Sequence, residues 1–259
     1  LRDLVRQVES TPEKSRDQFP AEVLPELESW FPAKVLDRME SGLRLIRGWD
    51  DPRLVNVGHA LLSDIVRDVS QQEPRDLRIR RRAQPIVDAP VAALLRNNVE
   101  TLLAKMSTLW DAPLFTHELG TSTVHDGSSA DRGLVEGIGA VDVAVTSPPY
   151  AAALPYIDTD RLSLALVFGM TAAGRKPLEA GLIGSREISK RERTAWETRL
   201  LADPASLRLP DSTIDFLTDY YKKVRADDHA GFRKQQGPAV LTRYFEAMRA
   251  VMENVARLL

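Results

Sequence analysis

The sequence contains no cysteine and no long apolar run, and its positive and negative charges almost cancel. The lack of cysteine excludes disulfides, cysteine-ligated zinc, iron–sulfur clusters and any mechanism with a cysteine nucleophile. No apolar run approaches the ~20 residues of a membrane span and no leader pattern is visible, so we expect a cytoplasmic protein without membrane association. A net charge of −2 excludes a uniformly basic nucleic-acid-binding protein, although local basic patches would suffice to bind a phosphate backbone.

Apolar residues recur every three or four positions through much of the first 110 residues, which predicts helices. An apolar content of 43% over 259 positions suits one large or two small globular domains with a real core. The helices are expected over 36–46, 54–69 and 95–109, and Asp51 with Pro52 is expected to open the second of them. The stretch 73–90 is rich in Arg and Pro without helical period, so we expect an exposed loop or basic arm there.

The pattern changes near residue 116. Residues 122–126 are β-prone and 131–138 can form a short helix. The apolar, β-branched run 141–145 lies between Gly139 and Pro148 and is typical of a buried parallel strand. Strand, short helix and strand make a βαβ unit, so we expect an α/β fold in this half of the chain.

Helices are expected again after this unit. Their predicted ranges are 160–170, 190–201, 214–224 and 238–259, the last with a long amphipathic pattern. Asp211 or Ser212 is expected to cap the helix over 214–224. The stretch 171–235 has the composition of an insertion.

The segment Thr146–Tyr150 leaves the carboxyl end of the predicted strand 141–145, where ligands bind in open α/β sheets. Pro148 and Pro149 make a stiff loop with carbonyl acceptors and two fewer N–H donors. An exocyclic amine could donate to the Ser147 oxygen and the Pro148 carbonyl, while a planar ring stacks on Tyr150 with ~1–3 kcal/mol per base. A double proline after a strand is also found in plain loops, so both interpretations stay open on these residues alone.

Ser147-Pro148-Pro149-Tyr150 resembles motif IV of the DNA amino-methyltransferases, which depend on S-adenosylmethionine. Serine in the first position is typical of the cytosine-N4 branch, whereas aspartate or asparagine is typical of the adenine-N6 branch. The segment 125–129 resembles motif III of the same family, and 154–162 is similar to the run that follows motif IV. The resemblance covers about residues 121–170 well and 236–259 loosely.

This resemblance implies a partial Rossmann-like methyltransferase core over 116–259, in which 171–235 is an insertion and a candidate for target recognition. Residues 1–115 would then be a helical insertion or partner-binding region. The implied reaction transfers a methyl group from S-adenosylmethionine to the N4 amine of a cytosine flipped out of double-stranded DNA. Methylation at cytosine C5 would need a cysteine, which the chain lacks. A restriction or defence system is a possible setting.

The resemblance also assigns roles to residues. Ser147, Pro148, Pro149 and Tyr150 would be catalytic, and Asp126, Thr146 and Ser147 would contact the cofactor. Hydrogen bonds from the amine to Ser147 and Pro148 would favour the tetrahedral nitrogen of the transition state, without a covalent enzyme intermediate. No metal is expected, because the four histidines show no ligand spacing.

Two alternatives remain beside cytosine-N4 methylation. The first is the same chemistry on adenine N6 or on an RNA amine. The second is a non-catalytic nucleic-acid-binding subunit or fragment. The family's Asp-Pro-Phe-x-Gly-x-Gly cofactor turn is missing, and Gly137-Ile138-Gly139 is too short to replace it. We therefore expect a fragment whose cofactor strand lies upstream of Leu1.

Two basic stretches are candidates for DNA contacts. One contains Arg78, Arg80, Arg81 and Arg82, which we expect to hold phosphates rather than bases. The other lies in the insertion and contains Lys190, Arg191 and Arg193. The competing interpretation for each stretch is a solvated helix face.

Overall fold

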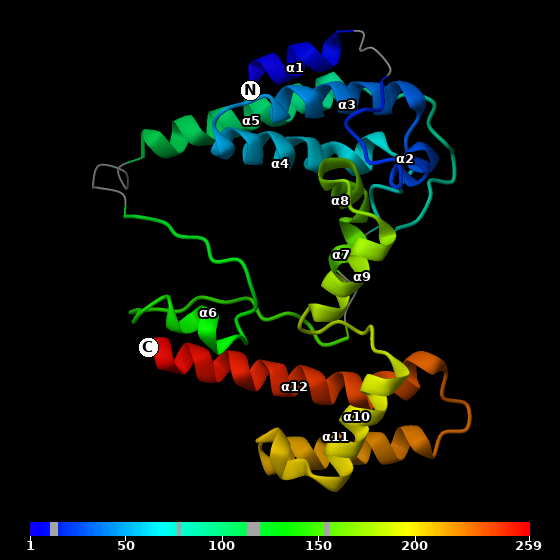
Figure 1. Ribbon diagram of the computed structural model, residues 1–259, viewed down its shortest axis with the longest axis vertical. Coiled ribbons are helices and arrows are strands. Elements are labelled where there is room, and N and C mark those ends of the chain that lie inside the picture. The colour runs from blue at the N-terminus through cyan, green and yellow to red at the C-terminus, as the bar shows by residue number, and fades with distance from the viewer. Residues whose placement is uncertain (11–14, 77–78, 113–119, 153–155) are drawn as a thin grey trace. The chain divides into compact units, whose positions relative to one another are not determined.

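The computed structural model describes residues 1–10, 15–76, 79–112, 120–152 and 156–259 (Figure 1). Helices make up 63% of the structure and strands 1%. Over the described ranges, the β-structure consists of an isolated antiparallel bridge between Gln72 and Arg81, and no sheet forms. The expected α/β fold with a Rossmann-like core is therefore wrong for this chain.

The chain divides into two compact units. Unit 1 contains Leu1–Thr121 and Tyr156–Arg175, and unit 2 contains Ser122–Pro155 and Lys176–Leu259. Residues 156–175 thus pack with the N-terminal helices, although they directly follow the Ser147–Tyr150 loop in the sequence. Helix α9 (Ala172–Gly181) spans the boundary between the units.

Unit 1 is built around one apolar core. Its helices are α1 (Arg2–Glu9), α2 (Leu24–Trp30), α3 (Ala33–Arg47), α4 (Pro52–Val69), α5 (Val91–Trp110), α7 (Tyr156–Thr159) and α8 (Arg161–Phe168). Helices α1, α3, α4 and α5 lie side by side in Figure 1 and bury Leu4, Leu43, Leu62 and Leu95 completely. The predictions of helices over 36–46, 54–69 and 95–109 are confirmed. Asp51 caps α4 as expected, since its side chain accepts a hydrogen bond from the Arg53 N–H at 2.9 Å.

Ion pairs attach the late segment of unit 1 to its early helices. Arg175 is buried and donates to both carboxylate oxygens of Glu26, at 2.8 and 2.9 Å. The guanidinium carbons of Arg81 and Arg161 lie 4.2 and 5.0 Å from the ring centroid of Trp30. Such cation–π contacts and charge-assisted hydrogen bonds favour a fixed orientation of the groups that they join. They join residues 26–30 to residues 161–175 across more than half of the chain.

Unit 2 is a smaller helical assembly around a long C-terminal helix. It contains α6 (Arg132–Glu136), α10 (Lys190–Ala202), the 3-10 helix η2 (Pro204–Leu207), α11 (Asp211–Arg225) and α12 (Phe232–Leu258). Helices α10 and α11 pack on α12 and bury Leu200, Leu207 and Leu217 (Figure 1). The predicted helices over 190–201, 214–224 and 238–259 are confirmed.

Helices α10 and α11 begin in different ways. Ser189 and Glu192 form a reciprocal capping box at the start of α10, which satisfies two backbone donors. The expected cap of α11 by Asp211 or Ser212 is wrong, because the helix already begins at Asp211 after Pro210. Its first turn has no side-chain cap.

The stretch 122–152 of unit 2 is mostly irregular, without assigned strands. The short helix α6 is present there, with Asp131 as its N-cap, but the β-prone run 122–126 and the run 141–145 do not pair with any described strand. Val143 and Val145 are 72% and 94% exposed, so the predicted buried strand is wrong. A strand needs a neighbour to satisfy its backbone groups, and α12 offers this segment only the Leu258 carbonyl, 2.8 Å from the Val141 N–H.

A search of the described helices finds none that is long and apolar enough to cross a membrane.

Candidate functional site

The Ser147–Tyr150 loop lies in unit 2 and is attached to α12 at Pro149. The Tyr244 hydroxyl donates to the Pro149 carbonyl at 3.0 Å. The ring of Tyr244 packs edge-to-face on Phe245, with 5.5 Å between the ring centroids. Within the described chain, residues 142–148 form no hydrogen bond of their own, so the Pro149 contact is where the loop becomes fixed.

A glycine turn supports the loop from a second direction. Gly184 has a left-handed φ of +87°, and a Cβ atom there would lie 2.6 Å from the carbonyl oxygen of Tyr150. The Gly184 carbonyl accepts a hydrogen bond from the Ala152 N–H at 3.0 Å. Glycine is required at this position for both its φ and the close backbone approach.

Arg243 secures this glycine turn to α12. Its guanidinium donates to the carbonyls of Ser185 and Glu187, the latter at 3.0 Å. Burial lowers the pKa of Arg243, and the Glu192 carboxylate partly opposes that effect. The neighbouring residues Arg243 and Tyr244 therefore hold the two backbone segments that meet at Gly184.

The groups that could bind an amine-bearing base are exposed to solvent and have no partners in the described structure. Ser147 and Pro148 are exposed, and the Tyr150 side chain is 77% exposed. In the described part of the protein, the Ser147 hydroxyl and the Pro148 carbonyl have no hydrogen-bond partner. The loop thus presents an acceptor pair and a flat aromatic ring on a backbone that is fixed immediately after them. This arrangement can accept two hydrogen bonds from an amine and stack a planar ring.

Sequence reasoning identified the loop but missed the residues that support it. Nothing local to Tyr244 distinguishes it from a core residue of an amphipathic helix. Gly184 gives a weak signal, since an isolated glycine between an apolar stretch and Ser185 indicates a turn. The predicted site residues Ser147, Pro148, Pro149 and Tyr150 come together only because they are consecutive.

The residues expected to contact S-adenosylmethionine do not form an enclosed site. Asp126 and Thr146 are both exposed and lie on irregular stretches. The neighbouring turn is held to α12, since the Asn254 side chain donates to the Ser129 carbonyl at 3.0 Å. A cavity of about 260 Å³ in unit 2 is lined by residues of α6 and α12, and by neither Asp126 nor Thr146. The described residues therefore do not fit the cofactor by themselves.

Two arginines of the first basic stretch are engaged in the fold of unit 1. Arg82 donates to the carbonyls of Asp68 and Ser70 at 2.7 and 3.0 Å, which caps the C-terminus of α4. Arg81 stacks on Trp30 and donates to the Ser29 carbonyl at 2.8 Å. Arg80 is exposed, whereas Arg78 lies outside the described residues.

The second basic stretch occupies the first turn of α10. Lys190 and Arg191 are exposed and available to a ligand. Arg193 is only 21% exposed, and its guanidinium faces the Glu197 carboxylate at 3.9 Å. Of the three residues predicted to contact DNA in this stretch, Lys190 and Arg191 are thus exposed, whereas Arg193 faces a carboxylate.

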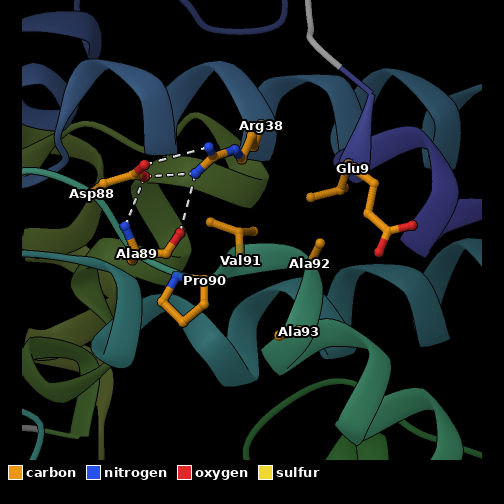
Figure 2. Close-up of a pocket in the computed structure, with 9 residues that line it drawn as sticks. Glu9, Arg38, Asp88, Ala89, Pro90, Val91, Ala92 and Ala93 are labelled. Carbon is orange, nitrogen blue, oxygen red and sulfur yellow. Dashed lines mark hydrogen bonds and ion pairs between the residues drawn. The ribbon is translucent and has the colours of Figure 1, made fainter.

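Unit 1 contains a larger cavity whose polar groups satisfy one another. It has a volume of about 510 Å³ and lies between α1, α3 and the turn before α5 (Figure 2). Arg38 pairs with the Asp88 carboxylate at 2.6 Å and also donates to the Ala89 carbonyl, as Figure 2 shows. The hydrogen bond from Arg38, followed by that from the Ala89 N–H, lowers the pKa of Asp88. These bonds attach the turn to α3, so we interpret this cavity as structural.

Comparisons of the chain with protein-family models, with curated proteins and with solved structures found no match. The function therefore has to be inferred from the residues of the site and their geometry.

Proposed function

We propose that this chain supplies the base-holding loop of a methyltransferase that modifies an exocyclic amine in DNA, with cytosine N4 as the preferred target. The observation that carries the proposal is the state of the Ser147–Tyr150 loop. Its motif resembles that of the amino-methyltransferases, and the three groups that would hold the amine and the base are exposed and unpaired. S-adenosylmethionine would be the methyl donor.

The residues of the loop have separate tasks in this proposal. The Tyr150 ring stacks on the flipped base, and the Ser147 oxygen with the Pro148 carbonyl accepts the two amine protons. The amine lone pair is delocalised into the base, which makes the nitrogen a poor nucleophile. Two acceptors placed out of the plane of the base favour the tetrahedral nitrogen, and so stabilise the transition state more than the ground state.

The part of the site that binds the methyl donor requires residues other than those of the Ser147–Tyr150 loop. Asp126 and Thr146 are exposed and do not line the cavity of unit 2, so they do not form a binding site for the methyl donor by themselves. Lys190 and Arg191 would contribute phosphate contacts, which raise affinity without reading sequence. A cytoplasmic location and a role in restriction or defence remain part of the proposal.

A methyl-transfer assay tests the proposal. The full-length protein is incubated with labelled S-adenosylmethionine and duplex DNA, and the modified base is identified by mass spectrometry. Ser147→Ala is expected to reduce transfer by about 100-fold, as for other groups that stabilise a transition state by hydrogen bonding. Tyr150→Ala is expected to reduce it by about 10- to 100-fold, because base stacking is lost.

Matched controls exist in the same unit. Ser212→Ala removes another exposed serine hydroxyl, and Phe232→Ala removes another aromatic ring that is 71% exposed. Both controls should leave transfer within about twofold of the wild type, as surface substitutions usually do. N6-methyladenine as the product would favour the adenine alternative. Full activity of both loop variants would contradict the proposal.

A non-catalytic nucleic-acid-binding role is the second candidate, because the described residues build no enclosed donor site. A DNA duplex carrying the fluorescent cytosine analogue pyrrolocytosine distinguishes the two. Quenching that depends on Tyr150, without methyl transfer, would favour the binding role. Transfer to cytosine N4 would exclude it.

A further inference from the structure

Tyr244 is far from the loop in the sequence but contacts it directly. Its hydroxyl reaches the Pro149 carbonyl at 3.0 Å, next to the Pro148 carbonyl and the Tyr150 ring to which the proposed function assigns the amine and the base. Pro149 has a fixed φ, so holding its carbonyl restricts the rotation of the peptide unit that leads to Tyr150. A contact at this atom therefore restrains the backbone from which the Tyr150 ring projects.

A closed set of hydrogen bonds surrounds this position. Tyr244 holds Pro149, the Ala152 N–H bonds the Gly184 carbonyl, and Arg243 holds Ser185. The two contacts of this set with α12 come from the consecutive residues Arg243 and Tyr244. Gly184 lies so close to the Tyr150 carbonyl that a Cβ atom at this position would clash with it. The Tyr244 hydroxyl bond is the one of these contacts that acts on Pro149 itself, since the others reach the loop through Ala152.

We propose that Tyr244 is a positioning residue, which sets the orientation of the Tyr150 ring and of the Pro148 carbonyl through its hydrogen bond to Pro149. This role rests on the proposed function of the loop, because it concerns how the base is held. Tyr244 does not touch the base or the reacting atoms. Its removal should disturb the geometry of base stacking and leave the phosphate contacts unaffected.

The test uses Tyr244→Phe, which deletes the hydroxyl and keeps the ring that packs on Phe245. Tyr220→Phe is the matched control, because Tyr220 stacks on Phe216 in the same unit and contacts neither the loop nor the Gly184 turn in the described structure. Both variants should retain the helical circular dichroism of the wild type. A variant that unfolds would be recognised by this signal.

The first readout is pyrrolocytosine fluorescence in a duplex bound by the chain. For Tyr244→Phe, we expect the quenching at saturation to fall by about threefold or more, since stacking depends on orientation. The salt dependence of Kd, which reports the phosphate contacts, should stay that of the wild type. Tyr220→Phe should match the wild type in both quantities. A merely structural role would alter the salt dependence and the quenching together or leave both unchanged, and either result would overturn the inference.

The second readout does not depend on nucleic acid. Fluorotyrosine placed at position 150 reports the surroundings of that ring by ¹⁹F NMR in the free chain. Tyr244→Phe should shift or broaden the resonance, and Tyr220→Phe should not. An unchanged resonance would contradict the positioning role even if the wild type stacks a base. A changed resonance in a chain that never stacks a base would instead contradict the proposed function.

Discussion

In unit 1 the charged side chains around the core are joined to one another across long stretches of sequence, whereas the polar groups of residues 142–148 in unit 2 are unpaired. Arg175 with Glu26 and Arg38 with Asp88 are examples of the first kind. The Ser147 hydroxyl and the Pro148 carbonyl are examples of the second. Polar groups that are already paired stabilise a fold, and those left open on a fixed backbone are the ones available to a ligand. This difference is why we assign the chemistry to unit 2.

The same contrast applies to apolar residues, and the largest expected effect is on the core of unit 1. Leu43 is fully buried, so Leu43→Ala should reduce the free energy of unfolding by about 2–5 kcal/mol. Val145 is 94% exposed, so Val145→Ala should change it by less than about 0.5 kcal/mol. Denaturant unfolding measures both. A large loss of unfolding free energy in Val145→Ala would show that this stretch is buried in the folded protein. The contrast between the buried core of unit 1 and the exposed run 141–145 would then be wrong.

The second prediction concerns the ion pair that joins residues 26 and 175. Arg175→Met should reduce the free energy of unfolding by about 1–3 kcal/mol, because Glu26 loses two hydrogen bonds in a site that is only partly reached by water. Arg191→Met is the control, since Arg191 is exposed and should contribute less than about 0.5 kcal/mol. Equal effects in denaturant unfolding would mean that the pair does not tie the late segment to unit 1.

A smaller effect is expected at the C-terminus of α4. Arg82→Met removes the hydrogen bonds to the last carbonyls of the helix and should cost about 1 kcal/mol of unfolding free energy. Arg80→Met serves as the control because Arg80 is exposed. If Arg82→Met weakened DNA binding at unchanged stability, Arg82 would be a phosphate contact rather than a cap.

The smallest effect is a pH dependence at the surface of unit 1. Hydrogen bonds from Arg44 and then Gln18 lower the pKa of Asp17 from 3.8 to about 2. A carboxylate with a lowered folded-state pKa stabilises the protein above its unfolded-state value, and this stabilisation is lost as the pH falls from 3.8 toward 2. The thermal midpoints of wild type and Asp17→Asn should therefore differ near pH 6, approach each other as the pH falls below 3.8, and converge only below about pH 2. A difference that persists at low pH would contradict this assignment.

Much of the helical structure was predictable from local patterns. The ranges 36–46, 54–69 and 95–109 lie inside α3, α4 and α5, and Asp51 caps α4 as its sequence context indicates. The run 141–145 was not predictable in the same way. Its β-branched residues favour an extended backbone, but whether such a run becomes a buried strand depends on a neighbour that no local pattern reveals. The α/β prediction failed at that step.

The candidate site also has one part that local sequence predicts and another that depends on tertiary contacts. The motif Ser147-Pro148-Pro149-Tyr150 is visible in the sequence because its members are consecutive, and the stiffness of its two prolines follows from their chemistry. Tyr244 and Gly184 could not be linked to it from local patterns, since 95 residues separate Tyr244 from Pro149.

The sequence by itself determined the longer helices of both units and the chemical character of the loop, because helical hydrogen bonds and proline geometry are local properties. Tertiary structure decided which arginines are engaged in the fold, that 141–145 stays unpaired, and that Tyr244 and Gly184 support the loop. These outcomes depend on contacts between distant residues, which form only when the apolar faces of the helices are buried together.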